Sequence, residues 1–303
     1  MMQSMLYKTQ ERHKMHNLPE SLQSHKHIVI GDTYYFPGME NQVYHQSAGI
    51  SSSTIRRFKQ SQLHAMQEVV EQTPAMAFGS AAHSLIVEGE DAFNNEVAVL
   101  TGSPYTASNK ELKREYEARG LTVIKQDDRN KIYAMNDALL EEGKVYLNAD
   151  AGEYPGAFDT PYENALYWYE KDTLLKLKGD VLRYPVVKPY ADNAIVVVDY
   201  KTTADCSVRG FTSSIRKFQY DLQAAFYKRG FEKAGFTVQD FIFVAQEKKA
   251  PYASKIFKMS QEDMDRGWLQ LEHTLGEYSA VAMGKQQPTV YNSPSVVEVN
   301  LSD

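Results

Sequence analysis

The sequence predicts an α/β domain with a central mixed β-sheet flanked by helices. Residues Ile195 to Val198 form an apolar run that is typical of a strand buried on both faces. Two segments of alternating apolar and polar residues, 165–169 and 174–184, flank Lys171-Asp172 and predict a β-hairpin. Helical patterns precede and follow these strands, as is typical of a sheet covered by helices.

The remaining elements follow from local signals along the chain. Residues 1–48 lack clear periodicity, so we expect an irregular arm or capping segment before a main domain at 49–285 and a tail at 286–303. Thr73 is expected to cap a helix that starts at Pro74 and ends near Gly89. The other predicted helices cover 51–70, 109–119, 127–147, 215–234 and 261–283, and the other predicted strands cover 121–124, 195–201 and 241–245.

The composition of this 303-residue chain is that of a globular protein, with 43% hydrophobic and 24% charged residues. The single cysteine, Cys206, excludes internal disulfides, a four-cysteine zinc site and a four-cysteine iron–sulfur cluster. No apolar run reaches the ~20 residues that span a bilayer, and Met1 to Gln10 lacks the apolar stretch of a signal peptide. We therefore expect a cytoplasmic protein without a membrane partner.

The chain has a net charge of −6, whereas most nucleic-acid-binding proteins carry a positively charged surface. Basic residues nevertheless cluster locally, first at Arg56 and Arg57 and again around Lys110 and Lys113. A charged cleft can coexist with an acidic exterior. Taken alone, each cluster could equally be a solvated helix face.

One predicted strand ends in Asp199-Tyr200-Lys201. Because alternate residues of a strand share a face, the Asp199 carboxylate and the Lys201 ammonium project together. A buried carboxylate is costly unless it is paired, hydrogen-bonded or bound to a metal. Asp180, which follows Gly179 late in the second hairpin strand, can reach the same end of the sheet if the two strands pair. Two carboxylates held this close repel unless a cation lies between them, and Mg²⁺ or Mn²⁺ is the natural candidate.

Five short motifs occur here in the order found in a known nuclease family. They are Gly49-Ile50-Ser51-Ser52-Ser53, Phe78-Gly79-Ser80-Ala81-Ala82-His83, Gly179-Asp180-Val181-Leu182, Val197-Val198-Asp199-Tyr200-Lys201-Thr202-Thr203 and Gln223-x-x-x-Tyr227. The series resembles the PD-(D/E)xK nucleases of the RecB and lambda-exonuclease type, and it is most similar to the nuclease domain of RecE (exonuclease VIII). The family usually has Pro-Asp where this chain has Gly179-Asp180, which keeps the acid and changes the turn before it.

The resemblance implies a restriction-endonuclease-like PD-(D/E)xK core and a metal centre. Asp180, Asp199 and the main-chain carbonyl of Tyr200 would bind catalytic Mg²⁺, for which Mn²⁺ would substitute. His83 would add a nitrogen ligand from its helix. Lys201 would orient and activate the attacking water and offset charge on the phosphoryl group.

The resemblance also implies residues that support the centre or contact DNA. Gln223 and Tyr227 lie at i and i+4 on one helix face, and they would support Lys201 or contact the DNA backbone. Ser53 resembles the serine that lambda-exonuclease-like enzymes place near a terminal phosphate. Arg56 and Arg57 follow on the same predicted helix and are candidate DNA-binding residues.

The function that the resemblance implies is a Mg²⁺-dependent exodeoxyribonuclease acting on linear double-stranded DNA. Degradation of the 5′-ended strand would leave a 3′ single-stranded tail for recombination by strand annealing. The implied partners are double-stranded DNA ends, further copies of the chain in a ring-like homo-oligomer, and a single-strand annealing protein. A phage or prophage origin fits this role, which places the protein in the cytosol of a bacterium or phage-infected host.

Two other functions stay open. The first is a single-strand or structure-selective nuclease of the same superfamily, acting in repair or CRISPR adaptation. The second is a non-catalytic DNA-end-binding protein on the same scaffold. Asp180, Asp199 and Lys201 together argue against the non-catalytic alternative, and the single cysteine argues against the iron–sulfur branch of the superfamily.

Overall fold

The computed structural model describes residues 17–67, 72–103, 105–150, 152–170 and 172–291. Within these residues, seven strands form one sheet in the order β1-β2-β5-β6-β7-β8-β9, and β3 and β4 form a separate parallel pair. In the large sheet β7 and β8 are parallel and the other neighbours are antiparallel, so the predicted mixed sheet is confirmed. The strands are β1 (Ile28–Ile30), β2 (Thr33–Phe36), β3 (Val97–Leu100), β4 (Thr122–Lys125), β5 (Tyr162–Glu170), β6 (Thr173–Arg183), β7 (Ala194–Thr203), β8 (Thr237–Glu247) and β9 (Ser254–Lys258).

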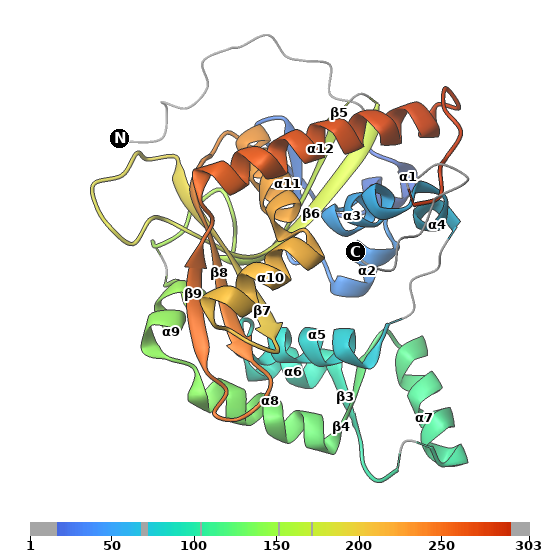
Figure 1. Ribbon diagram of the computed structural model, residues 1–303, viewed down its shortest axis with the longest axis vertical. Helices are drawn as coiled ribbons and strands as arrows, with labels where there is room; N and C mark the ends of the chain where they lie inside the picture. The colour runs from blue at the N-terminus through green and yellow to red at the C-terminus, as the bar shows by residue number, and fades with distance from the viewer. Residues whose placement is uncertain (1–16, 68–71, 104, 151, 171, 292–303) are drawn as a thin grey trace, which may run out of the picture.

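Helices cover both faces of the large sheet (Figure 1). Helices α3, α10, α11 and α12 contribute to the core on one face, whereas α5, α8 and α9 contribute to the core on the other. A third, smaller core covers β2 and β5 with α1 and α2. The helices are α1 (Glu20–Gln23), α2 (Asn41–Gln46), α3 (Ser52–Gln60), α4 (Gln62–Gln67), α5 (Pro74–Ile86), α6 (Glu90–Glu96), α7 (Ala107–Ala118), α8 (Gln126–Ala138), α9 (Glu141–Leu147), α10 (Val208–Phe218), α11 (Tyr220–Lys233) and α12 (Gln261–Ala282).

Strand β7 is buried on both faces, as its apolar run predicts. Ile195 and Val197 pack into the core beneath α11, whereas Val196 and Val198 pack into the core beneath α5. This alternation is the period of two that a pleated strand imposes. Asp199 continues the face of Val197, so its carboxylate is directed toward α11 rather than toward solvent.

Helix α11 packs very closely on β5 and β6. A Cβ atom added at Gly230 would lie 2.9 Å from the Trp168 ring, and it would also meet the Leu177 side chain. Only a residue without a side chain lets the helix approach the sheet this closely. The close approach brings the side chains of α11 within reach of the end of β7.

Local signals placed the start of α5 correctly. The Thr73 side chain accepts a hydrogen bond of 3.2 Å from the Met76 N–H, and Pro74 occupies the first helical position. The helix ends at Ile86, and Gly89 follows with a φ of 97°. No helix in the described part of the chain is both long and apolar enough to cross a membrane.

The structure differs from the sequence-based prediction in several places. The helices predicted at 51–70 and 127–147 are each divided within the described residues, into α3 and α4 and into α8 and α9. Residues 28–36, expected within an irregular arm, form β1 and β2 and extend the sheet beyond β5. Residues 90–100 form α6 and β3, and residues 254–258 form β9, none of which we predicted. The helix predicted at 215–234 is two helices, because Gln219 adopts a left-handed conformation (φ 53°) between α10 and α11. The predicted arm at 1–48 and tail at 286–303 lie partly outside the described residues, and their limits stay predictions.

Candidate active site

The two predicted acids meet where β6 and β7 pair. Val181 lies opposite Val198 in this antiparallel pair, so one further step of the register places Asp180 opposite Asp199. The Asp180 Oδ2 atom accepts a hydrogen bond of 2.9 Å from the Tyr200 main-chain N–H, which ties the two strands together. Strand β7 ends between α10 and α5 (Figure 1). The acids therefore lie where helices from both faces of the sheet can add side chains.

Asp199 is a buried carboxylate with only 1% of its side chain exposed. The Lys201 Nζ atom lies 2.5 Å from its Oδ1, and the Gln223 Nε2 donates a hydrogen bond of 2.6 Å to its Oδ2. Burial raises the pKa of Asp199 from 3.8 to about 7; Lys201 opposes this rise and the neighbouring Asp180 adds to it. Ionised Asp199 is thus costly in this setting, and a bound cation would favour it.

Lys201 is the cationic side chain that pairs with Asp199. Burial lowers the pKa of Lys201, but Asp199, Tyr220 and Asp180 outweigh that effect and raise it, so the amine stays protonated. The Nζ atom also lies 5.1 Å from the centre of the Tyr220 ring, within the range of a cation–π contact. These contacts hold the Lys201 ammonium beside Asp199, as the sequence predicts.

His83 reaches the same end of the sheet from α5. Its Nε2 atom lies 3.3 Å from Asp180 Oδ2 and 3.4 Å from Glu163 Oε1, and its Nδ1 atom lies 3.3 Å from Glu88 Oε1. Burial lowers the pKa of His83, but the three carboxylates outweigh it and raise the pKa well above 6.5. Burial raises the pKa of Asp180, but His83 and the other donors around it bring that pKa down to about 2.

Glu163 and Glu88 are site residues that the sequence did not reveal. Glu163 belongs to β5, in the position opposite Asp180, and it adopts a left-handed backbone conformation (φ 53°) that is uncommon for a residue with a side chain. Its Oε2 atom forms an ion pair of 2.8 Å with Lys178 Nζ. Nothing in the sequence around Glu163 indicates this conformation. Glu88 lies five residues after His83, just past the end of α5.

Gln223 and Tyr227 lie on the face of α11 that packs on the sheet, but their partners differ from those predicted. Gln223 binds Asp199 rather than Lys201. The Tyr227 hydroxyl donates a hydrogen bond of 3.0 Å to the main-chain carbonyl of Lys178 in β6. Both side chains are buried and bond the strands that carry the acids, Gln223 through the same Asp199 that pairs with Lys201, and their contact with the DNA backbone stays a prediction.

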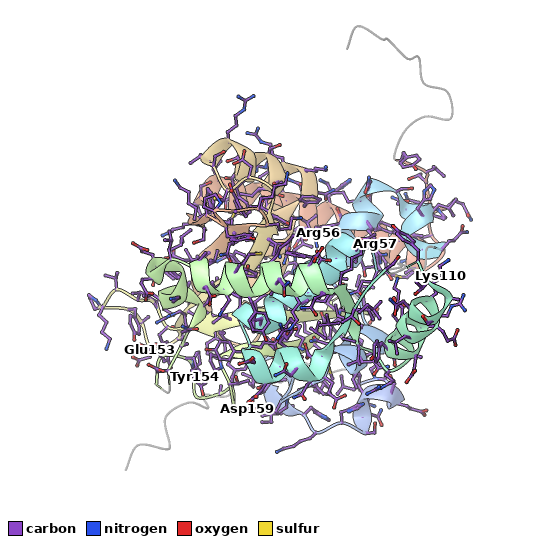
Figure 2. The ribbon with its side chains drawn as sticks, turned by 90° about the horizontal axis from the view of Figure 1, so that it is seen from below. Arg56, Arg57, Lys110, Glu153, Tyr154 and Asp159 are labelled. Carbon is purple, nitrogen blue, oxygen red and sulfur yellow. The ribbon has the colours of Figure 1, made fainter. Side chains whose placement is uncertain are left out.

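The candidate DNA-binding residues lie on α3. Ser53 is exposed, and its Oγ lies 2.8 Å from the Ser51 Oγ. The Arg56 Nη1 donates a hydrogen bond of 2.7 Å to the Phe218 carbonyl at the end of α10, and its guanidinium lies 5.9 Å from the centre of the Tyr220 ring. Figure 2 shows Arg56 and Arg57 next to each other on this helix. Arg56 thus shares Tyr220 with Lys201, which links α3 to the acidic cluster.

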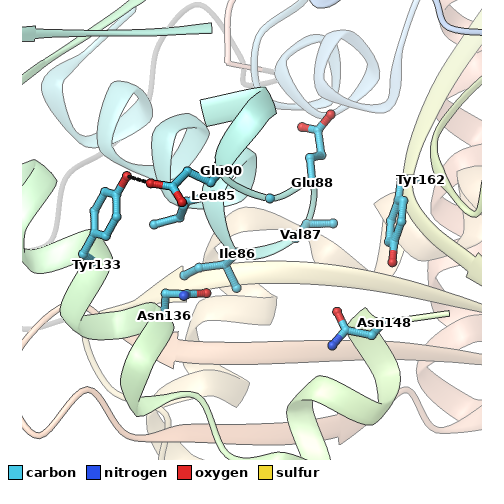
Figure 3. Close-up of a pocket in the computed structure, with 10 residues that line it drawn as sticks. Leu85, Ile86, Val87, Glu88, Glu90, Tyr133, Asn136, Asn148 and Tyr162 are labelled. Carbon is cyan, nitrogen blue, oxygen red and sulfur yellow. Dashed lines mark hydrogen bonds between the residues drawn. The ribbon is translucent and has the colours of Figure 1, made fainter. Parts of the chain in front are cut away.

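A cavity of about 380 Å³ lies beside Glu88 (Figure 3). Its wall includes the amides of Asn136 and Asn148 and the hydroxyl of Tyr162. Tyr133 closes one side, where its hydroxyl donates a hydrogen bond of 3.1 Å to Glu90. Glu88 lines this cavity and also belongs to the acidic cluster. None of the predicted site residues lines the cavity.

The cluster fits a hard divalent cation. Three carboxylates, those of Asp180, Glu163 and Glu88, lie around His83, and the fourth, that of Asp199, pairs with Lys201, while Lys178 pairs with Glu163. The His83 Nε2 atom is buried and has no hydrogen-bond partner among the described residues. Carboxylate oxygens with one imidazole nitrogen are suitable ligands for Mg²⁺ or Mn²⁺, and a cation would relieve the repulsion among the acids.

Comparisons with known proteins agree with this geometry. A family model described as "PDDEXK-like domain of unknown function (DUF3799)" matches residues 162–293, which include Glu163, Asp180, Asp199 and Lys201. No curated protein sequence matches the chain. Among solved structures, a crystal structure of a "Putative exonuclease" from Eubacterium rectale is similar with a TM-score of 0.57 and 13% identity, over 87% of this chain and 96% of that chain.

The two comparisons bear on different parts of the prediction. The structural similarity, at 13% identity, supports the fold over almost the whole described chain. The family model covers the strands that carry both acids and the lysine, and the helix that carries Gln223 and Tyr227. Neither distinguishes RecE from other branches, so that closer placement stays a prediction. Residues 162–293 therefore match a PDDEXK-like domain, within a fold that is similar to that of the E. rectale structure.

Proposed function

We propose that this protein is a Mg²⁺-dependent exodeoxyribonuclease that degrades linear double-stranded DNA from 5′ to 3′ and leaves 3′ single-stranded tails for strand annealing. The observation that carries the proposal is the meeting of Asp180 and Asp199 beside the Lys201 amine at one end of a buried sheet. The similarity to a protein described as a "Putative exonuclease" supports the choice of an exonuclease over other nucleases.

Each residue of the site has a distinct role in the proposed hydrolysis of phosphodiester bonds. Asp180, Asp199, the Tyr200 carbonyl and His83 would hold the cation, which would polarise the phosphate and lower the pKa of a bound water. Lys201, fixed 2.5 Å from Asp199, offsets the negative charge that develops on the phosphoryl oxygens. Gln223 keeps the Asp199 carboxylate in place through its hydrogen bond of 2.6 Å.

We base the proposed path of the DNA on the basic and hydroxyl side chains of α3. Ser53 is exposed near the start of α3, and Arg56 lies against the Tyr220 ring that Lys201 also contacts. We infer that Ser53, Arg56 and Arg57 contact the phosphates of the bound strand, because arginine fits phosphate geometry well. Action at duplex ends, a ring-like homo-oligomer, a single-strand annealing partner and a cytosolic location in a bacterium or phage-infected host complete the proposal.

A panel of DNA substrates tests the function and its alternatives. We expect degradation of linear duplex in Mg²⁺ or Mn²⁺, protection of closed circles, and no activity in EDTA. Loss of a label from the 5′ end before a label from the 3′ end would establish the polarity. Cleavage of closed circles or of single strands alone would favour a structure-selective nuclease, and binding of ends without cleavage would favour a non-catalytic protein.

Two variants assign any activity to this site. Asp199→Asn keeps the size of the side chain and removes its charge, so activity should fall by at least about a thousandfold, a loss that corresponds to ~4 kcal/mol of transition-state stabilisation. Asp240→Asn is the matched control, because Asp240 lies on the neighbouring strand β8 and pairs with Lys258. Equal activity of the Asp199→Asn variant and the wild type would remove the proposed site.

A further inference from the structure

His83 has two ring nitrogens that face different carboxylates. A neutral imidazole carries one N–H group and one lone pair, so it binds a cation through one nitrogen while the other nitrogen donates a hydrogen bond. In metal sites the donated hydrogen bond commonly goes to a carboxylate, which fixes the tautomer and the plane of the ring. The carboxylates around His83 therefore have different roles, depending on which nitrogen they face.

The two sides of the ring are not equivalent. Nδ1 faces one acid, Glu88, at 3.3 Å. Nε2 faces two, Asp180 at 3.3 Å and Glu163 at 3.4 Å, and this buried nitrogen has no hydrogen-bond partner among the residues that the structure describes. Once the ring is neutral, the Nε2 lone pair beside two carboxylates provides a ligand set, and Glu88 Oε1, which has no hydrogen-bond partner among the described residues, can accept the Nδ1 proton. One ligand atom each of His83, Glu88 and Glu163 lies within 4.8 Å of the other two, so all three belong to the same cluster.

Glu163 is held in place for this role. Lys178 Nζ lies 2.8 Å from Glu163 Oε2 and donates a hydrogen bond of 2.6 Å to Asn41 Oδ1, so the second carboxylate oxygen, Oε1, is left facing His83. The left-handed backbone at Glu163 (φ 53°) is uncommon for a residue with a side chain and persists only where its surroundings impose it. This strained position directs the side chain to the point where His83 and Asp180 meet.

The separations are suitable for a shared cation. Ligand atoms on neighbouring corners of an octahedron with bonds of ~2.1 Å lie ~3.0 Å apart. The Nε2 atom lies 3.3 Å from Asp180 and 3.4 Å from Glu163, so small side-chain shifts would close the site. All three contacts of the ring, at 3.3 to 3.4 Å, exceed the ~2.7–2.9 Å of a charge-assisted hydrogen bond, so the two sides of the ring differ in the number of carboxylates and not in distance.

We propose that Glu163 is a further cation ligand, acting with Asp180 and the Nε2 atom of His83, and that Glu88 is a positioning residue that accepts the Nδ1 proton and orients the imidazole. This inference rests on the cation-dependent function proposed above and deepens it. It separates the roles of two acids that are equally close to the ring. It also assigns a function to the left-handed backbone of Glu163.

The test measures binding of Mn²⁺ alone, without DNA, by titration calorimetry. Glu163→Gln should lower the affinity by at least about a hundredfold or reduce the number of ions bound, because a charged ligand is lost. Glu88→Gln should lower it by about ten- to a hundredfold, the usual effect of losing the partner of a metal-bound histidine. Glu90→Gln is the matched control, since Glu90 lies two residues from Glu88 and bonds Tyr133 instead of His83; its affinity should equal that of the wild type.

Electron spin-echo spectroscopy of bound Mn²⁺ with ¹⁵N-labelled histidine provides the second readout. Coupling to one histidine nitrogen should persist in Glu163→Gln and weaken in Glu88→Gln. The assignment would be overturned if Glu163→Gln bound Mn²⁺ with wild-type affinity, or if Glu88→Gln changed neither the affinity nor the nitrogen coupling. It would also be overturned if the wild type bound no Mn²⁺. A wild type that binds Mn²⁺ as described but cleaves no DNA would contradict the proposed nuclease and support the cation assignment.

Discussion

Replacing Asp199 by Asn should stabilise the metal-free protein while it abolishes the proposed activity. The carboxylate is 1% exposed, and burial raises its pKa from 3.8 to about 7. Each pKa unit corresponds to ~1.4 kcal/mol, so ionising Asp199 in the folded protein at pH 8 costs up to ~4 kcal/mol more than in the unfolded chain. Asn resembles the protonated acid in shape and can still accept the Gln223 hydrogen bond. A gain of about 1 to 4 kcal/mol is therefore expected.

The sign of this effect depends on pH. A carboxyl group with a raised folded-state pKa binds more protons in the folded state between about pH 4 and pH 7, so wild-type stability falls as the pH rises through this window. Urea unfolding in EDTA at pH 8 and pH 5 measures it, and the gain in the Asn variant should shrink at pH 5. Asp205→Asn is the control: a hydrogen bond from the Ser207 N–H lowers the pKa of Asp205, so its loss should not stabilise. A destabilised or unchanged Asp199→Asn variant at pH 8 would refute this reasoning.

Three further outcomes follow from other contacts. Mn²⁺ affinity, measured by calorimetry, should fall by at least about tenfold between pH 8 and pH 6, because the pKa of Asp199 is about 7, the pKa of His83 is raised, and the cation must displace the proton of each; constant affinity would contradict the pKa assignment. Gly230→Ala should lower the free energy of unfolding in urea by about 1 to 3 kcal/mol, because its Cβ would lie 2.9 Å from the Trp168 ring, and an unchanged midpoint would contradict the close packing of α11. Tyr227→Phe removes the hydrogen bond to the Lys178 carbonyl, so stability should fall by about 1 kcal/mol and DNA cleavage should slow; full activity would show that this bond does not position β6.

The sequence allowed prediction of the parts of the fold that hydrophobic periodicity specifies. The apolar run before Asp199 and the hairpin before Asp180 are strongly patterned, and their pairing placed the two acids opposite each other. Strands β1 and β2 were missed because each is short, and β2 becomes buried only by pairing with β5. The break at Gln219 was missed because neither Gly nor Pro marks it, although the helical pattern runs through it.

The site was predictable only where motif and strand pattern coincide. Asp180, Asp199 and Lys201 follow from strand ends, and His83 follows from the family resemblance. Glu163 was missed because its role depends on a left-handed backbone conformation and on Lys178, neither of which leaves a trace in the local sequence. Contacts of this kind arise from tertiary structure, since residues far apart in the chain must first be brought together.

The most direct test of the central claim is a crystal structure with Mn²⁺, located by its anomalous scattering. We predict anomalous density at Asp180, either between its carboxylate and that of Asp199, in contact with the Tyr200 carbonyl and with Lys201 beside it, or between its carboxylate, Glu163 and the Nε2 atom of His83. A peak elsewhere, or a refined structure in which the two carboxylates point away from each other and bind no ion at saturating Mn²⁺, would contradict the account.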